Sequence, residues 1–156
     1  MQINTRVFGE IEIDDNKIIT FDNGLMGFEE YKRYAIIFDS EKESKGKIMW
    51  LQSMDDPRLA FPVIDPMFVN PEYNPIVEDE WLESIGEFNS GEDLYVLAVL
   101  TVPSDLTRMT ANMKAPLIIN TLTKKGCQMI VNNEDYLVRY NVYEYIQSIR
   151  KEAGEC

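Results

Sequence analysis

The chain has 156 residues, a formal net charge of -12 and a pI of about 4.4. Its 45% hydrophobic and 11% aromatic content is typical of a globular protein with one core, so we expect a single domain over residues 1–156. There is no histidine, which removes the commonest general base and metal ligand and disfavours zinc hydrolases and Ser-His or Cys-His catalysis.

In chain order, the first third is predicted to form short strands separated by turns. Ile3, Thr5 and Val7 alternate with polar neighbours, Gly9 interrupts this run, and the alternation continues from Ile11. The segments predicted next are a turn at 14–16, a strand at 17–21, a turn at 22–24, one helical turn at 29–33, strands at 34–38 and 47–52 around a charged loop at 40–46, and a strand at 60–64.

The middle of the chain is acidic throughout. Between Arg58 and Arg108 there is no lysine or arginine, whereas the carboxylates there are Asp65, Glu72, Glu78, Asp79, Glu80, Glu83, Glu87, Glu92, Asp93 and Asp105. Uncompensated charge attracts partners of the opposite sign, and nucleic-acid phosphates must be met by Lys or Arg. This stretch therefore predicts a basic protein partner and disfavours direct binding of nucleic acid. The alternative is an acidic surface that only maintains solubility.

A short acidic helix is predicted inside this stretch, at 79–87. At helical spacing, Trp81, Leu82 and Ile85 fall on one side and the carboxylates fall on the other. Such a helix would pack its aromatic side on the domain and hold its acids toward solvent. Acids early in a helix also suit the helix dipole without any partner, so this alternative stays open.

The last third combines buried strands with a C-terminal helix. Residues 94–102 are continuously apolar except for Thr101, which predicts a strand buried on both faces. Segments 115–122 and 127–131 are predicted to form a hairpin around 124–126. Asn141 followed by Glu144 has the pattern of a capping box before a helix that would end at Gly154. Together the elements predict a mainly β fold: an antiparallel, barrel-like or sandwich-like curled sheet with one short acidic helix and a C-terminal helix.

Sequence signatures of catalysis are absent, including the P-loop and the nucleophile elbow. The adjacent pair Asp55-Asp56 is the best alternative site, for a carboxylate-dependent hydrolase or an enzyme using Mg²⁺ or Ca²⁺. However, adjacent residues on an extended chain point to opposite faces, which favours a simple turn before Pro57. Cys127 and Cys156 have no metal or redox spacing, so we expect no cofactor.

The location expected for the chain is the cytoplasm. No apolar run approaches the roughly 20 residues needed to span a bilayer. The sequence starts directly with alternating residues, so no signal peptide is visible. We expect a reduced protein that does not contact the membrane.

Two longer motifs are more specific. Residues 19–29 read I-T-F-D-N-G-L-M-G-F-E, and residues 110–120 read T-A-N-M-K-A-P-L-I-I-N. Between them, Leu51-Gln52-Ser53 precedes Leu59-Ala60-Phe61. In this order the motifs resemble the flagellar assembly factor FliW family over residues 1–140. The family often has proline where this chain has Asp22 and Met26.

The resemblance implies a non-enzymatic protein binder with a β-rich, barrel-like fold. FliW proteins bind the RNA-binding translational regulator CsrA and antagonise it, and the resemblance favours a contact outside the RNA site. They also bind newly made flagellin, so that accumulated flagellin leaves CsrA free to repress flagellin synthesis. The implied partners are therefore a CsrA-type regulator and flagellin, with no direct contact to nucleic acid.

The predicted partner contacts combine charges that steer a basic protein with apolar anchors. They are Phe68, Glu72, Tyr73, Glu78, Asp79, Glu80, Trp81, Glu83, Glu87, Glu92 and Asp93.

Overall fold

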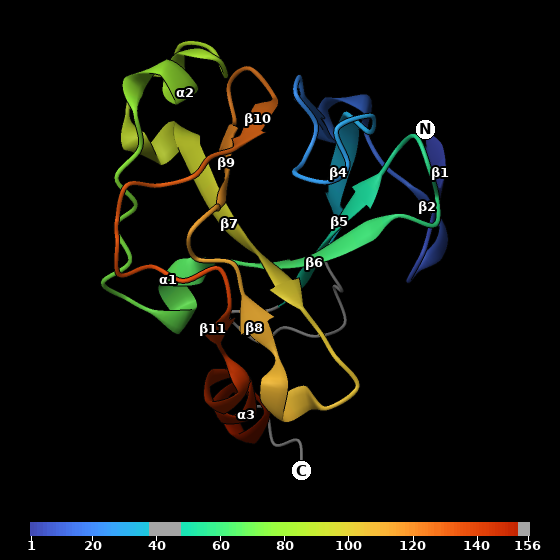
Figure 1. Ribbon diagram of the computed structural model, residues 1–156. Coiled ribbons are helices and arrows are strands. Elements are labelled where there is room, and N and C mark those ends of the chain that lie inside the picture. Colours follow the sequence, from blue (N-terminus) through green and yellow to red (C-terminus); the bar gives the residue numbers. More distant parts are fainter. Residues whose placement is uncertain (38–47, 153–156) are drawn as a thin grey trace.

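The centre of the molecule is a closed ring of seven strands (Figure 1). The computed structural model describes residues 1–37 and 48–152, with side chains as far as Gln147. In ring order the strands are β7 (Leu94–Thr101), β6 (Ala60–Ile64), β5 (Met49–Ser53), β4 (Arg33–Ile37), β3 (Ile18–Phe21), β10 (Lys125–Gln128) and β9 (Leu117–Asn120), which pairs again with β7. Every pairing in the ring is antiparallel except that of β10 with β3. The predicted mainly β, antiparallel, barrel-like fold is confirmed.

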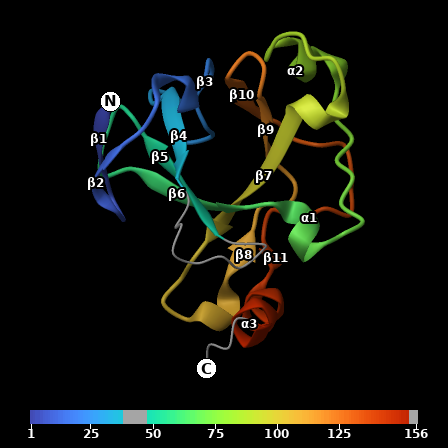
Figure 2. The same ribbon diagram turned by 180° about the vertical axis from the view of Figure 1, so that it is seen from behind.

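Short elements surround the ring. The hairpin of β1 (Gln2–Thr5) and β2 (Gly9–Glu12) forms a separate two-stranded sheet. In the main sheet, β8 (Thr110–Ala111) pairs with the last two residues of β7, and β11 (Tyr140–Asn141) pairs with β8. The helices are α1 (Pro66–Val69), α2 (Asp79–Glu83) and α3 (Tyr143–Glu152). Figures 1 and 2 show α2 and α3 at opposite ends of the molecule, with β7 running between them.

Neighbouring residues on a ring strand belong to different apolar clusters because side chains alternate across a strand. Leu97 and Leu117 pack inside the barrel with Phe21 and Tyr34. Ala98, next to Leu97, packs in a second cluster with residues of β8 and α3. The strand β7 is therefore covered on both faces in its middle, as its uninterrupted apolar sequence predicts.

The ring closes through a short seam. Only two residue pairs join β10 to β3, Lys125 with Thr20 and Gly126 with Phe21. The amide of Thr20 also donates to the carbonyl of Lys124 at 2.9 Å. A Cβ atom at residue 126 would lie 2.7 Å from Cε2 of the buried Phe21 ring. Closure therefore depends on glycine at this position.

Three local predictions are corrected by the structure. The helical turn expected at 29–33 is wrong, because a bridge between Leu25 and Phe28 turns the chain and β4 already begins at Arg33. The β9–β10 turn lies at 121–124, where Lys124 adopts a positive φ of 59°, so 125–126 belong to the strand.

The third correction concerns the acidic helix, which ends at Glu83 and not at 87, because Gly86 turns the chain with a φ of +91°. The C-terminal helix begins at Tyr143, one residue later than a cap at Asn141 predicts, and the Asn141 side chain accepts from the amide of Tyr143. The predicted loop at 40–46, the terminator Gly154 and Cys156 lie outside the described residues.

The core contains one polar group whose removal should be tolerated. The hydroxyl of Tyr34 is buried and has no hydrogen-bond partner within residues 1–37 and 48–147. A buried polar group without a partner costs stability, so we expect Tyr34→Phe to keep or raise the unfolding free energy at pH 7 by about 1 kcal/mol. Urea unfolding measures this change, and a loss above about 1 kcal/mol would contradict it.

The same hydroxyl predicts alkaline sensitivity. Burial, with smaller effects of Asp55 and Tyr31, raises the pKa of Tyr34 from 10.0 to about 12. The folded state keeps a proton that the unfolded chain releases. The stabilisation is therefore fully present below the unfolded pKa of 10.0 and is lost as the pH rises through the folded pKa of about 12. Tyr34→Phe should weaken this loss without abolishing it, because burial also raises the pKa of Tyr73 and Tyr95.

Candidate protein-binding surface

The acidic segment is held on the outer face of the barrel by α2. Ile85 is buried there against Ile118 and Met129, and Trp81 and Leu82 pack partly buried on the same cluster. The side chains of Glu78, Asp79, Glu80 and Glu83 are exposed. The predicted separation of an apolar and an acidic side of this helix is therefore confirmed.

The chain after α2 is fixed by two polar residues of the β9–β10 hairpin. The fully buried amide of Asn120 donates to the carbonyls of Ile85, Gly86 and Glu87 at 3.1, 3.3 and 3.1 Å. Its oxygen accepts from the amides of Leu122 and Thr123 in the hairpin turn. The hydroxyl of Thr123 also donates to Ile85. The last residue of the T-A-N-M-K-A-P-L-I-I-N motif thus joins the acidic segment to the barrel.

Most of the predicted carboxylates belong to α2, to the short 3₁₀ turn Gly91–Asp93 before β7, or to the chain next to these elements. We call this group the acidic end; it comprises Glu78, Asp79, Glu80, Glu83, Glu87, Glu92 and Asp93. Figure 1 shows α2 at the end of the molecule where β7 begins. Within residues 1–37 and 48–147, the ion pairs join Arg33 to Asp55, Arg58 to Asp56 and Lys125 to Asp22, and none involves the acidic end. Its charge is therefore not neutralised by side chains of the described residues.

Asp93 differs from the rest of the acidic end. Its carboxylate accepts from the amides of Asn89 and Ser90 at 2.9 and 3.2 Å and completes a capping box. It is also partly buried. Local structure accounts for this residue without a partner.

An open hollow of about 620 Å³ lies within the acidic end, lined by three of its carboxylates, Asp79, Glu83 and Glu87. Leu82 and Phe88 contribute apolar surface to the same hollow. Neither residue is among the contacts predicted from the sequence. Leu82 is predicted only to pack on the domain, and Phe88 lies outside the predicted helix at 79–87. The hollow offers acceptors for Lys or Arg beside apolar surface. No group of three or more Cys, Asp or Glu side chains in the described part of the chain is placed to hold a metal ion.

The remaining predicted contacts lie elsewhere. Phe68 is exposed on α1 and Glu72 is exposed just after it, and both figures show α1 well separated from α2. Tyr73 is only 4% exposed, stacks on Tyr136 with ring centroids 4.7 Å apart, and donates to the carbonyl of Met113. The side chain of Tyr73 is therefore too buried to contact a partner, and we assign it to the core.

Each carboxylate of the alternative site, Asp55 and Asp56, forms an ion pair with an arginine. The Arg33 guanidinium donates to Asp55 at 2.9 Å. Burial by itself would raise the pKa of Asp55, but this contact and the amides of Lys32 and Arg33 lower it overall. Arg58 donates to Asp56 at 3.2 Å through Nε, and its hydrogen bonds lower the pKa of that carboxyl.

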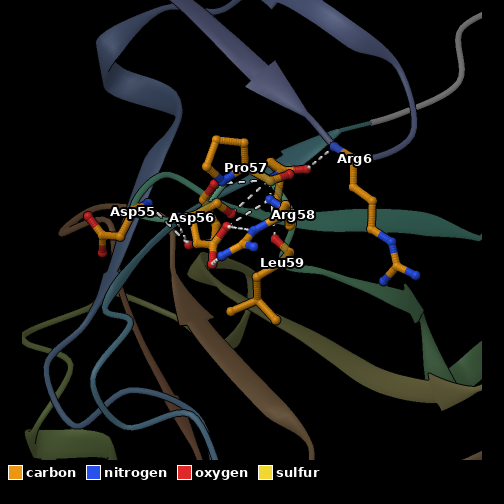
Figure 3. Close-up of polar contacts among 8 residues, drawn as sticks. Arg6, Asp55, Asp56, Pro57, Arg58 and Leu59 are labelled. Atoms are coloured by element: carbon orange, nitrogen blue, oxygen red, sulfur yellow. Dashed lines mark hydrogen bonds and ion pairs between the residues drawn. The ribbon is translucent and has the colours of Figure 1, made fainter.

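The pair belongs to a loop held by one buried side chain. Figure 3 shows the side chain of Asp55 directed away from that of Asp56, which points to Arg58. Gln52, near the end of β5, donates to the carbonyls of Ser53, Pro57 and Leu59 and accepts from the amide of Arg6. The geometry is that of the predicted turn, and the two carboxylates do not converge on a common ligand.

A family model described as FliW protein matches residues 2–142. The flagellar assembly factor FliW of Lachnoclostridium phytofermentans is 52% identical over 157 residues, covering 100% of both chains. The flagellar assembly factor FliW of Lachnospira eligens is 47% identical, covering 94% of this chain and 97% of the relative. A crystal structure of the flagellar assembly factor FliW aligns with a TM-score of 0.81 and 30% identity, covering 91% of this chain and 96% of that chain. No helix of the described residues has the length and apolar character needed to cross a membrane.

Proposed function

The chain belongs to the FliW family, and from this membership we propose that it is a non-enzymatic regulatory protein of the cytoplasm. In this proposal it binds and antagonises a CsrA-type RNA-binding translational regulator and also binds flagellin, coupling flagellin synthesis to flagellar assembly. The observation that carries the proposal is the acidic end: three of its carboxylates line a hollow together with apolar side chains, and none of its carboxylates has an ion-pair partner among residues 1–37 and 48–147.

The acidic end suits the regulator better than it suits RNA. A protein that binds RNA must present Lys and Arg to the phosphates, so its surface is basic. A cluster of carboxylates attracts such a surface and repels the RNA itself. Long-range attraction of this kind raises the association rate more than it slows dissociation. The acidic end is therefore proposed to steer the regulator, while apolar contacts at Trp81, Leu82 and Phe88 hold it.

Removing charge from the acidic end should slow association. We expect Glu80→Gln, Glu83→Gln and Glu87→Gln together to lower the association rate with a purified CsrA-type regulator about five- to tenfold at low salt. Stopped-flow kinetics would measure the rate, and the difference from wild type should shrink as salt rises because salt screens exposed charges. The dissociation rate should change much less.

A matched control separates this local effect from net charge. Glu10→Gln, Glu12→Gln and Asp14→Asn remove the same number of charges from exposed positions on and after the β1–β2 hairpin, which lies far from α2 in both views. This control should associate at nearly the wild-type rate. Equal rates for the two triple variants would contradict steering by the acidic end.

The whole proposal is tested by direct binding. The purified chain is mixed at low salt with a CsrA-type regulator or with flagellin, and complexes are separated by size-exclusion chromatography. Both complexes are expected, and the regulator complex should dissociate at high salt. Failure to bind either protein would refute the proposal. A ternary complex of chain, regulator and RNA would indicate a contact outside the RNA site, as the family resemblance leads us to expect.

A further inference from the structure

A second hollow joins three segments that are far apart in the sequence. It has a volume of about 220 Å³ and is lined by Met26 and Glu29 of the G-L-M-G-F-E loop, Trp81 of α2, and Cys127 and Gln128 of β10. We call it the Met26 notch. It shares α2 with the acidic end, because Trp81 lines the notch while Glu80 and Glu83 lie on the exposed side of the same helix.

The loop that forms one wall of the notch is held in place by its backbone. The amide of Met26 donates to the Gln128 side chain at 2.8 Å, and Gln128 in turn donates to the carbonyl of Ala115 at 3.1 Å. Gly24 adopts a φ of +66° and lies so close to the backbone of Glu29 that a Cβ atom would be 2.5 Å from its Cα. A site held in this way needs little ordering when it binds, which favours affinity.

The side chain of Met26 is not needed to hold this loop. It is 45% exposed, whereas its neighbour Leu25 is buried at 3%. The loop therefore buries one apolar residue for stability and leaves the next one at the mouth of the hollow. Methionine is flexible and polarizable, so it adapts to different apolar ligands and contacts aromatic rings favourably.

The size and walls of the notch indicate what it can hold. A smaller apolar cavity of about 150 Å³ accepts benzene, so the space suffices for one Phe, Leu or Met side chain. The walls are mostly apolar. Glu29 supplies the carboxylate at this site, and one of its oxygens accepts from the amide of Gly27. Two lysines lie beside the same loop, but Lys125 is paired with Asp22 and Lys32 donates to the carbonyl of Asp22. The charged residue of the lining itself is Glu29, which favours a cation beside the apolar group and disfavours a phosphate.

We propose that the Met26 notch receives one large apolar side chain, next to Lys or Arg in the sequence, from the basic RNA-binding regulator. This inference rests on the proposed function and adds to it a residue-level anchor. Charges at the acidic end set the association rate, whereas a desolvated anchor in a preformed hollow sets the dissociation rate. The two sites therefore predict separable kinetic effects.

The test compares two exposed methionines. Met26→Asp places a charge in the notch, and Met67→Asp makes the same change on α1, where Met67 is 55% exposed and does not line the notch. With the regulator, we expect Met26→Asp to raise the dissociation rate at least about tenfold, as for an interface anchor. Met67→Asp should leave it unchanged. Both variants add negative charge, so electrostatic attraction alone would not weaken binding to a basic protein. Met26→Leu, which keeps the apolar volume, should retain wild-type dissociation.

The outcomes distinguish this inference from the proposed function. If wild type binds the regulator and Met26→Asp dissociates no faster than Met67→Asp, the notch is not its anchor and the proposed function stands. If Met26→Asp accelerates release of flagellin alone, the assignment to the regulator is overturned. If wild type does not bind the regulator at all, the proposed antagonism and the notch inference both fail. Circular dichroism confirms that each variant is folded.

Discussion

Replacing Gly126 by alanine is expected to destabilise the barrel by about 1–3 kcal/mol, the usual cost of overpacking a well-packed core. The new methyl group would lie 2.7 and 2.8 Å from two carbons of the Phe21 ring, which is fully buried and packs edge-on against Tyr34. The ring has no room to withdraw without disturbing the barrel interior. Only two residue pairs join β10 to β3, so a shift here opens the seam. Urea unfolding measures the loss.

A matched control and a second substitution test this explanation. At Gly91 an added Cβ meets nothing within 4 Å, so Gly91→Ala should change stability by less than about 0.5 kcal/mol. Phe21→Leu, which replaces the ring by a smaller side chain, should lower the unfolding free energy less in the Gly126→Ala variant than in wild type. The reason is that the effects of substitutions at contacting residues are not additive. Additive effects would show that the close approach of Gly126 to Phe21 does not limit stability.

Replacing Asn120 by aspartate should destabilise the protein by about 3–5 kcal/mol at pH 7, which is typical of an uncompensated buried charge. The amide nitrogen that donates to three carbonyls would become an oxygen that repels them. The residue is fully buried, so water cannot compensate. The loss should be greatest around α2, which the amide holds to the hairpin, and hydrogen exchange of the 85–87 amides would detect it.

The pH dependence gives this prediction a distinct signature. A carboxyl group facing carbonyl oxygens binds its proton more tightly in the folded protein than in the unfolded chain. The destabilisation should therefore be smallest near the ordinary carboxyl pKa of about 4 and should grow as pH rises. Asn132→Asp, at an exposed position, introduces the same charge and should have little effect at any pH. A pH-independent loss at residue 120 would contradict the buried-charge explanation.

Local patterns predicted the elements whose sequence and environment agree. β7 is apolar on both sides, and the structure covers both sides, so its burial could be inferred directly. The amphipathic character of α2 was likewise visible in Trp81, Leu82 and Ile85. Closure of the ring was not predictable in this way, because it joins Gly126 to Phe21, about a hundred residues apart, and depends on the space beside one ring.

Other features depend on distant partners that periodicity does not reveal. The acidic helix ends early because Gly86 and the amide of Asn120 direct the chain toward the hairpin. Tyr73 resembles an exposed anchor in the sequence, but the stacked ring of Tyr136 and the carbonyl of Met113 bury it. The Met26 notch was not foreseen, since its walls come from the first, middle and last thirds of the chain.

The parallel seam also has a consequence for how the molecule is made. During synthesis β3 to β7 emerge from the ribosome well before β9 and β10, so the growing sheet has two unpaired edges, β3 and β7, until about residue 128 is available. An unfinished sheet of this kind is prone to pair with other chains. The ring should therefore close only after β9 and β10 have been synthesised, and closure should be slow for a protein of this size, since the decisive contacts connect remote parts of the chain.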